Sequence, residues 1–381
     1  MGKDLVFVGG GHAHLTSLLH IPDFTRLGHK VTLISPSPYR YYSGMGPGML
    51  SGIYQPWEVR FHVKKMAANR GARFIEGKVV KVDPPGRLLF LGSGEEVHYD
   101  VVSFNTGSEV PLESLAPIPS DNLYTVKPVI NLFRARQAIL KLVKNNKPFH
   151  GVVVGGGPAG VEICANLWRL LDQSGGKGRI TLLAGTRLMA DAPDRVRTLA
   201  MSSFSQSGIE VIEGSRVKTV EKRTILLSDG KELDFDLAFI AIGIRPSSLF
   251  KDSGIPTGQD GGLLVNPYLQ SVAHPEVFGG GDCISLSGNP LSKVGVYAVR
   301  ENPVLYRNLQ AALEGGKLEP FKPQRHFLLI FNMGNGRGIF WKKNWVWEGR
   351  LAFLLKDYID RKFMRTFQVS GELEERSNDI L

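Results

Sequence analysis

Two glycine-rich stretches that repeat one pattern constrain this chain more than any other feature. Residues 5–19 read LVFVGGGHAHLTSLL, and residues 151–167 read GVVVGGGPAGVEICANL. In each, an apolar run precedes Gly-x-Gly, and apolar residues then recur at a helical period. A second apolar run follows each copy, HKVTLISP at 29–36 and GRITLLAG at 178–185. This order predicts two nucleotide-binding units, in which N–H groups at a helix start approach a pyrophosphate.

The two copies differ at the third position of the glycine fingerprint. The second copy has the full pattern, which consists of Gly155, Gly157 and Gly160. The first copy keeps Gly9 and Gly11, but His14 stands where a glycine would let the helix and strand pack closely. Two interpretations of His14 are therefore open, a tolerated packing residue and a direct contact to phosphate.

The length and charge of the chain exclude several classes of protein. A chain of 381 residues is longer than a single core usually supports, so two or three domains are expected. The net charge is +10, but the chain has no long basic block and no DNA- or RNA-binding motif, so we expect no nucleic-acid partner. Apolar runs such as DLAFIAIGI at 236–244 are too short to span a bilayer. We expect a cytoplasmic location, either free or peripheral on the cytosolic face of a membrane.

Thiol and metal chemistry are not expected. Cys164 and Cys283 lie far apart in the sequence, which excludes a CxxC redox pair and a four-cysteine zinc site. We expect Cys164 to be buried for structural reasons. We expect Cys283 to lie near the cofactor that the motifs described below indicate, without being reactive. No GxSxG motif, HExxH motif or cluster of histidine ligands occurs, so neither covalent catalysis nor a metal site is indicated.

Three further stretches complete the set of motifs. VVSFNTGSEVP at 101–111 and LAFIAIGIRPS at 237–247 each read as an apolar strand that ends in a glycine turn, one after each nucleotide-binding unit. PEVFGGGDCISLSG at 275–288 runs from a short strand into Gly-Asp, and a helix follows it. Asp282 is thereby placed to accept hydrogen bonds from a ribityl chain, and the helix start to stabilise the negative charge of a reduced flavin.

Taken together, these motifs resemble the flavoproteins with two dinucleotide-binding domains, the pyridine nucleotide-disulfide oxidoreductase family, over about residues 4–315. VTLISPSPYRYYSGMGPGML, SKVGVYAVRENP and LKDYIDRKFM are similar to the NADH-dehydrogenase-like subgroup, which includes the flavoprotein domain sometimes fused to selenide, water dikinase. The resemblance implies an α/β fold of two Rossmann-like domains, with FAD in the N-terminal unit and NADH or NADPH in the inserted one. It implies an FAD-binding domain of residues 1–115 and 245–318, an NAD(P)H-binding domain of residues 116–244, and a C-terminal interface segment of residues 319–381.

The resemblance also implies the site residues. Lys293 is expected to offset charge on the reduced flavin or to bind the acceptor, and Glu162 to lie near the nicotinamide. The expected cofactor-binding residues are Gly9, Gly11, His14, Ser35, Gly44, Pro47, Thr106, Gly107, Gly155, Gly157, Gly160, Arg187, Gly243, Gly281, Asp282, Gly295 and Val296.

The chain departs from the family pattern at the positions that read a ribose. Ser35 replaces the expected acid after the first unit, where a serine still hydrogen-bonds an adenosine ribose. After the second unit, LLAGTR has no acid, so selection against a 2′-phosphate is lost, and Arg187 follows closely. Arg187 either grips the phosphate of NADPH or is a solvated surface residue.

The predicted function is that of an FAD-dependent NAD(P)H dehydrogenase. NAD(P)H gives a hydride to FAD, and electrons pass to a quinone or another small acceptor without redox cysteines. One alternative is a flavin-binding sensor or interaction module with little turnover. A second is an enzyme like the sulfide:quinone oxidoreductases, which the cysteine count disfavours.

The C-terminal residues predict an amphipathic basic helix that begins near Trp347. Its apolar stripe comprises Leu351, Leu354, Leu355, Tyr358, Ile359, Phe363 and Phe367. Such a helix either packs its stripe on the FAD domain or lies in a membrane interface. We expect it to pack over the flavin side of the FAD domain, with any membrane contact peripheral. A homodimer contact through this segment is a further hypothesis.

Overall fold

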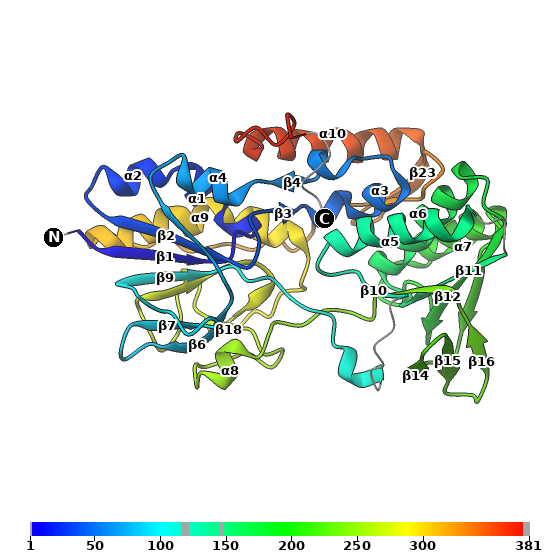
Figure 1. Cartoon of the computed structure of the whole chain (residues 1–381), viewed down its shortest axis with the longest axis horizontal. Coiled ribbons are helices and arrows are strands. Elements are labelled where there is room, and N and C mark those ends of the chain that lie inside the picture. Colours follow the sequence, from blue (N-terminus) through cyan, green and yellow to red (C-terminus); the bar gives the residue numbers. More distant parts are fainter. Residues whose placement is uncertain (1, 116–121, 145–147, 376–381) are drawn as a thin grey trace.

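Two five-stranded parallel sheets form the framework of the molecule (Figure 1). The computed structural model describes residues 2–115, 122–144 and 148–375. The expected α/β class with two Rossmann-like domains is confirmed by these sheets and the helices that cover them. The expected domain boundary at residue 116 falls in the segment 116–121, which lies outside the described residues.

The first sheet has the strand order β19-β9-β1-β2-β5. Its strands are β19 (Val277–Gly279), β9 (Val101–Phe104), β1 (Asp4–Val8), β2 (Lys30–Ser35) and β5 (Arg73–Glu76). One side of this sheet is covered by the helices α1 (Leu15–Leu19), α2 (Ile21–Thr25), α4 (Val63–Ala68) and α9 (Gly295–Glu314) (Figure 1). On the other side lies an antiparallel sheet of β6 (Val79–Asp83), β7 (Leu88–Leu91) and β8 (Glu96–His98). The strand order reverses between β1 and β9, which is where α/β sheets bind ligands.

The second sheet repeats this plan with the strand order β10-β17-β11-β12-β13. Its strands are β10 (Leu123–Thr125), β17 (Leu237–Ile240), β11 (Phe149–Val154), β12 (Gly178–Gly185) and β13 (Glu210–Glu213). Its helices are α5 (Ile130–Val143), α6 (Pro158–Gln173) and α7 (Asp194–Gln206), and the small sheet opposite them consists of β14 (Val217–Glu221), β15 (Thr224–Leu227) and β16 (Glu232–Asp234). Here the strand order reverses between β11 and β17.

The remaining elements of the two domains are short, and one of them, α3 (Gly46–Ser51), contacts the second domain. This helix comes from the N-terminal part of the chain but packs on α5 and α6 of the second domain. The remaining short elements are β3 (Arg40–Tyr41), β4 (Arg60–Phe61), α8 (Leu249–Asp252), β18 (Leu263–Val265), β20 (Ile284–Leu286) and the 3₁₀ turns His12–His14, Ser43–Met45, Pro56–Glu58, Leu112–Leu115 and Gly281–Cys283.

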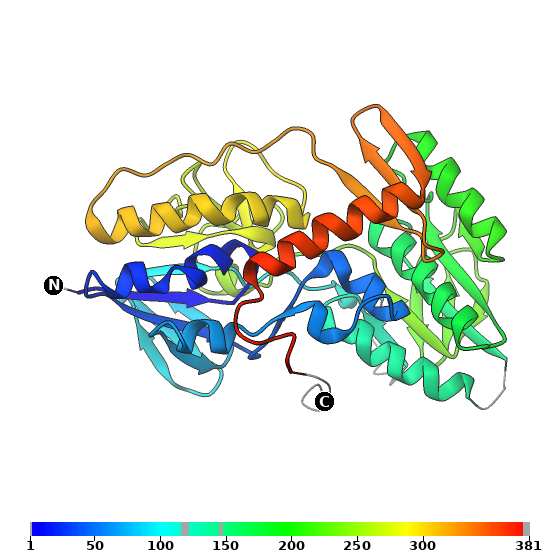
Figure 2. The ribbon, with the colours of Figure 1, turned by 90° about the horizontal axis from the view of Figure 1, so that it is seen from above.

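The C-terminal segment contacts both domains (Figure 2). It consists of an antiparallel sheet of β21 (Leu329–Asn332), β22 (Gly338–Lys342) and β23 (Trp345–Gly349), followed by α10 (Arg350–Phe367). The sheet packs on α6 and α7, and α10 then crosses to α1 in the first domain. The predicted amphipathic helix therefore exists, and it begins at Arg350, directly after β23, which contains Trp347.

The central strands are buried along their whole length. Every residue of β9, β11 and β17 is buried, as expected for parallel strands covered on both faces. Within the described part of the chain, no helix has the length and apolar character needed to cross a bilayer.

Candidate functional site

One large cavity lies between the two domains, at the carboxyl ends of both parallel sheets. Its volume is about 1740 Å³, and both glycine turns line it. Cavities for one drug-sized ligand are typically ~300–1,000 Å³, so this cavity has room for more than one such molecule. Because β1, β9, β11 and β17 all end at its wall, both nucleotide-binding units open onto the same space.

The first glycine turn is fixed by the strand next to it. Gly9 has a φ of +89°, and a Cβ atom there would lie 2.3 Å from the backbone oxygen of Asn105. Only glycine fits this left-handed position. The turn therefore lets β1 and β9 meet closely at the cavity wall.

The second glycine turn follows the full fingerprint. Gly155 and Gly157 line the cavity, while Gly160 does not. A Cβ atom at Gly160 would lie 1.8 Å from the oxygen of Gly155, so this glycine allows α6 to pack against the turn. That is the packing role assigned to the third glycine of the pattern.

His14 lies behind the first turn and does not line the cavity. Its Nδ1 is 2.6 Å from the oxygen of Gly9, and its Nε2 is 2.8 Å from the hydroxyl of Ser103. The ring is fully buried against Phe7, and burial lowers the pKa of His14 to about 4. Both ring nitrogens are used inside the protein, so this placement speaks against a phosphate contact and favours packing.

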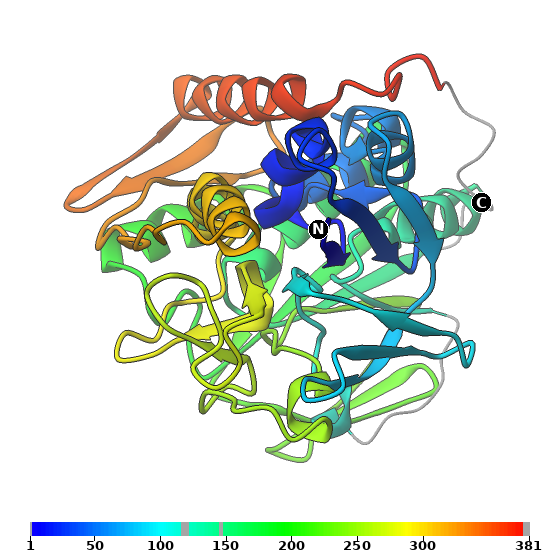
Figure 3. The same cartoon turned by 90° about the vertical axis from the view of Figure 1, so that its left-hand side faces the viewer.

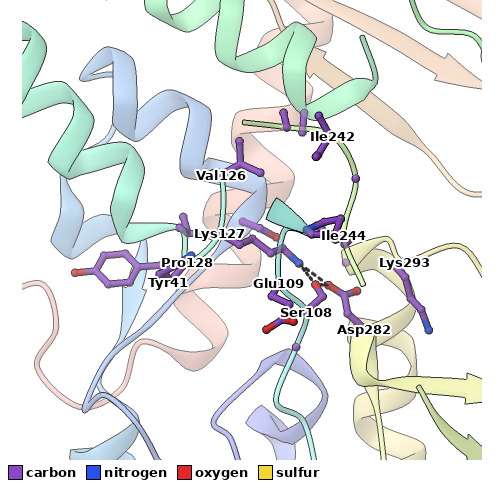
Figure 4. A pocket seen from close by; sticks show the side chains of 18 of the residues that line it. Tyr41, Ser108, Glu109, Val126, Lys127, Pro128, Ile242, Ile244, Asp282 and Lys293 are labelled. Carbon is purple, nitrogen blue, oxygen red and sulfur yellow. Dashed lines mark hydrogen bonds and ion pairs between the residues drawn. The ribbon is translucent and has the colours of Figure 1, made fainter. Parts of the chain in front are cut away.

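A charged cluster stands where the Gly-Asp motif meets the cavity (Figure 4). The ammonium of Lys127 is 2.6 Å from Oδ2 of Asp282, and the hydroxyl of Ser108 donates to the same oxygen at 2.8 Å. Burial acts to raise the pKa of Asp282, but the charge of Lys127 and these hydrogen bonds outweigh it and lower the pKa. Asp282 therefore stays ionised, and its Oδ1 has no partner among the described residues.

Lys127 was not identified from the sequence. It follows the three-residue strand β10 and comes from the second domain, yet its partner Asp282 lies 155 residues further along the chain. A short strand of mixed character, LYT, gives no periodic signal. Lys127 lies at the site because the two sheets face the same cavity, which a local sequence pattern does not show.

Arg40 is a half-buried cation without an ion-pair partner among the described residues. It lines the cavity beside Gly107, and its Nε atom is buried without a hydrogen-bond partner. Burial lowers the pKa of Arg40, although the charge of Asp282 opposes this shift. An uncompensated guanidinium in such a wall is suited to an anionic ligand such as a pyrophosphate.

His12 and Thr106 also carry buried polar atoms without partners in the described structure. Nε2 of His12 and Oγ1 of Thr106 make no hydrogen bond, and both residues line the cavity. Burial and the charge of Arg40 lower the pKa of His12 to about 3, so the ring is neutral. With Arg40 and Asp282, these atoms form a polar set that fits the phosphates and ribityl hydroxyls of FAD.

Lys293 lines the cavity, but its ammonium is already paired. It lies 2.7 Å from Oδ2 of Asp260 and also donates to the backbone oxygen of Ile284. Figure 4 shows the side chain pointing away from Asp282. The expected role of Lys293 beside a flavin or acceptor would require this pair to open.

Glu162 is half-buried where α6, the C-terminal sheet and α10 meet. Its Oε1 accepts the backbone N–H of Asn332 at 2.8 Å, and burial raises its pKa while the charge of Lys356 lowers it. Lys356 bonds to Asp360 at 2.9 Å, and the hydroxyl of Tyr42 donates to Asp360 at 3.0 Å. The C-terminal segment therefore supplies the groups that compensate Glu162.

Two arginines line the cavity near the end of β12, Arg187 just after this strand and Arg216 just before β14. Arg187 is 2.5 Å from the exposed carboxylate of Asp194. Arg216, which the sequence did not single out, donates to the hydroxyl of Thr186 at 3.3 Å. Ala184 and Gly185 stand where an acid would bind a ribose 2′-hydroxyl, so this end of the cavity is basic.

The other expected site residues divide into two groups. Those that line the cavity are Ser35, Pro47, Thr106, Gly107, Gly243, Gly281 and Gly295. Those outside its lining, with His14 and Gly160, are Gly11, Gly44 and Val296. Gly44 instead accepts a hydrogen bond from Lys356 at 2.8 Å, and Gly11 packs against the side chain of Asn105. These residues support the wall from behind.

The two cysteines are buried and free. Burial raises the pKa of Cys164, in α6, and of Cys283, whose thiol donates to the backbone oxygen of Gly280 at 3.3 Å. Neither thiol lines the cavity. In the described residues, no three His, Cys, Asp or Glu side chains are grouped to hold a metal ion.

Known proteins resemble this chain both in sequence and in fold. The sequence model of the family described as "Pyridine nucleotide-disulphide oxidoreductase" matches residues 3–313. Ferroptosis suppressor protein 1 of Xenopus tropicalis is 29% identical over 281 residues, which is 70% of this chain and 70% of that protein. The demethylphylloquinone reductase of Synechocystis is 23% identical and covers 84% of this chain and 82% of its own. The structure of NDH2 from Plasmodium falciparum with NADH superposes with a TM-score of 0.80 at 15% identity over both whole chains.

Proposed function

Because the chain belongs to the pyridine nucleotide-disulphide oxidoreductase family, it is an FAD-dependent oxidoreductase that uses NAD(P)H, and we propose that its acceptor is a lipid-soluble quinone. When bound, FAD accepts a hydride from NAD(P)H and passes the electrons to the acceptor. The observation that carries the proposal is that both glycine turns open onto one cavity. The relative from Synechocystis is named as a demethylphylloquinone reductase, which supports the choice of a quinone as acceptor.

We assign FAD to the part of the cavity next to the first sheet. Gly9 and the helical turn after it accept the pyrophosphate, with the unpaired guanidinium of Arg40 beside it. Asp282 accepts from the ribityl hydroxyls through Oδ1, while Lys127 and Ser108 hold its other oxygen. The start of α9 at Gly295 faces the same space, so its N–H groups favour negative charge there.

We assign the nicotinamide nucleotide to the part next to the second sheet. Gly155 and Gly157 approach its pyrophosphate, and Glu162 stands further along the same wall. Arg187 and Arg216 border its adenosine ribose, so NADPH as well as NADH is accepted. Under this assignment the NAD(P)H-binding domain comprises residues 116–244, and residues 1–115 with 245–318 bind FAD.

We propose that α10 contacts a membrane from one side. Its residues Leu351 and Tyr358 are 72% and 62% exposed, and Trp345 in the neighbouring β23 is 76% exposed. In Figures 1 and 3, α10 runs along an edge of the molecule with no element outside it. Exposed cations flank this apolar face at Lys342, Lys343, Arg350, Lys362 and Arg365. Apolar residues with surrounding cations are suited to the interface of an anionic bilayer, where quinones dissolve.

The test is anaerobic reduction followed by oxidation with a quinone. The purified yellow protein is mixed with NADH or NADPH without oxygen, and the flavin absorbance is followed. Rapid bleaching, and its reversal by a quinone carried in anionic vesicles, is the expected result. A flavin that stays oxidised with both nucleotides would contradict the proposal and favour a sensor, and bleaching that only other oxidants reverse would exclude quinone.

A further inference from the structure

A carboxyl group lies buried directly behind the Gly-Asp motif. Glu301, in the second turn of α9, is 2% exposed. Its Oε2 accepts the backbone N–H of Gly281 at 2.5 Å. Gly281 has a φ of +74° and precedes Asp282, so Glu301 holds the loop that presents Asp282 to the large cavity.

Glu301 has no cation of its own among the described residues. Asp282 is paired with Lys127, and Lys293 is paired with Asp260. Each of these cations already has a carboxylate partner, so Glu301 forms no salt bridge with either of them. A buried carboxylate without a partner is costly, and protonation removes that cost.

A second, small cavity gives Glu301 access to a proton. Its volume is about 20 Å³, and Glu301, Asp282, Ser292 and Lys293 are among the residues that line it. This volume holds about one water molecule beside several polar groups. Gly281, Asp282, Lys293 and Val294 line both cavities, so Glu301 lies one layer behind the wall of the large one.

The charged groups around Glu301 are few. The 3₁₀ turn before α1 contributes His12 and His14, whose pKa values are lowered by burial to about 3 and about 4, so both are neutral. The turn of Gly281–Cys283 contributes ionised Asp282 and a protonated thiol, whose pKa burial raises. Strands β9 and β19 and helix α1 contribute no acidic or basic side chain, and α9 itself carries Tyr297 and Arg300 nearby, the latter exposed. Asp282 and Lys293 are therefore the charges that act most directly on Glu301.

These surroundings place the titration of Glu301 in the neutral range. Burial raises the pKa of Glu301 to about 7, the charge of Asp282 adds to this, and the N–H of Gly281 and the charge of Lys293 oppose it. A group that is half-protonated near neutrality responds strongly to any further charge nearby.

We propose that Glu301 is a positioning residue that takes up one proton when negative charge forms at the α9 end of the large cavity. This rests on the proposed function, which puts the flavin ring there. NAD(P)H supplies two electrons and one proton as a hydride, so one negative charge is left at the ring. The carboxylate of Glu301 then gains a proton from water and forms an O–H bond, and no further group is oxidised or reduced. By reciprocity, protonated Glu301 makes reduction more favourable.

The test compares the holoprotein with its Glu301→Gln and Glu314→Gln variants. Glutamine keeps the volume and the oxygen that accepts from Gly281, but cannot ionise. Glu314 is the matched control because it ends the same helix and pairs with His29 at the surface. Each protein is reduced photochemically, without NAD(P)H, between pH 6 and pH 9, and infrared difference spectra and the flavin midpoint potential are recorded.

In the wild type and in Glu314→Gln, reduction above pH 7 is expected to produce a protonated-carboxyl band. The midpoint potential is also expected to fall as pH rises across the neutral range, with the steeper slope that corresponds to one additional proton taken up per flavin reduced. Both signals should be absent from Glu301→Gln. A pH-indicator dye gives an independent measure of the number of protons that the wild type takes up on reduction.

A wild type without the band and without the extra proton uptake would overturn the inference, and so would identical behaviour of Glu301→Gln. Because the photoreduction takes its electrons from an added sacrificial donor such as EDTA, which is oxidised under light, neither result depends on NAD(P)H as donor. If the protein binds and reduces FAD normally but shows no such proton uptake, only the role proposed for Glu301 is contradicted. A protein that cannot bind FAD contradicts the proposed function as well.

Discussion

Charged side chains in the cavity wall are compensated in two different ways. Asp282 and Lys127 neutralise each other, while Arg40 has no partner among the described residues. The charges of the first pair cancel, whereas the charge of Arg40 does not. The position of Arg40 is therefore more informative about the charge of the ligand than the ion pair is.

Replacing Asp282 by alanine is expected to weaken FAD binding. The variant loses an ionised acceptor and leaves Lys127 unpaired in the wall, and a hydrogen bond to a charged group is worth roughly 1.5–3 kcal/mol, or about 10–100-fold in affinity. The dissociation constant of FAD for the reconstituted apoprotein measures this. Glu319→Ala is the control, because it breaks an ion pair with Arg307 and neither of these residues lines the large cavity. Equal FAD affinity in the wild type and Asp282→Ala would remove Asp282 from the binding site.

At the scale of whole elements, the two strand–turn–helix units were predictable because their signals are local. Each glycine pattern is contained within a few residues, and buried parallel strands read as continuous apolar runs. The outward face of α10 was not predictable in this way. We expected its apolar stripe to pack on the FAD domain. This was wrong for the five stripe residues that are exposed, which are Leu351, Leu354, Leu355, Tyr358 and Ile359.

The inward face of α10 explains this difference. Lys356 and Asp360 lie there with little exposure because Glu162, Gly44 and Tyr42, from distant parts of the chain, provide their partners. Helical periodicity assigns such charges to the solvent side. Phe363 and Phe367, near the end of the helix, pack inward as the stripe predicted.

Introducing charge on the exposed face of α10 is expected to reduce membrane binding without affecting the flavin. In a Leu351→Glu/Leu354→Glu variant, two exposed apolar side chains are lost, and binding to anionic vesicles should fall about tenfold or more. Flotation with liposomes measures this, and flavin content should stay unchanged. Leu27→Glu alters a similarly exposed leucine in the loop between α2 and β2 and should float like the wild type. If the double variant also floats normally, α10 is not the membrane contact.

For the molecule as a whole, buried carboxyls make stability depend on pH. The pKa of Glu301 is raised by burial to about 7, and that of Glu162 is raised as well. For an acid whose pKa is higher in the folded state, stability is fully present below its unfolded pKa and is lost as pH rises through the folded value. The wild type is therefore expected to lose stability between about pH 5 and pH 8.

Melting temperatures of the holoprotein and of Glu301→Gln across this range test the prediction. The difference should be small at pH 5 and favour Glu301→Gln at pH 8, since a tenfold difference in proton affinity between the folded and unfolded chain corresponds to about 1.4 kcal/mol. Glu314→Gln, at the surface end of α9, should follow the wild type. Parallel curves for all three proteins would show that Glu301 does not titrate near neutrality.

The position of the C-terminal segment also determines the order in which the chain can be completed during synthesis. Residues 123–240 contain every strand of the second sheet, so this domain can form while the first sheet still waits for β19. Helix α9 and the Gly-Asp turn emerge next, and β21 and α10 follow last. Since chains leave the ribosome from the N-terminus, Asn332 and Lys356, which surround Glu162, are made after both parallel sheets are complete. A residue that lines the cavity, Glu162, therefore gains the groups that compensate its charge only after the rest of the cavity wall has been synthesised.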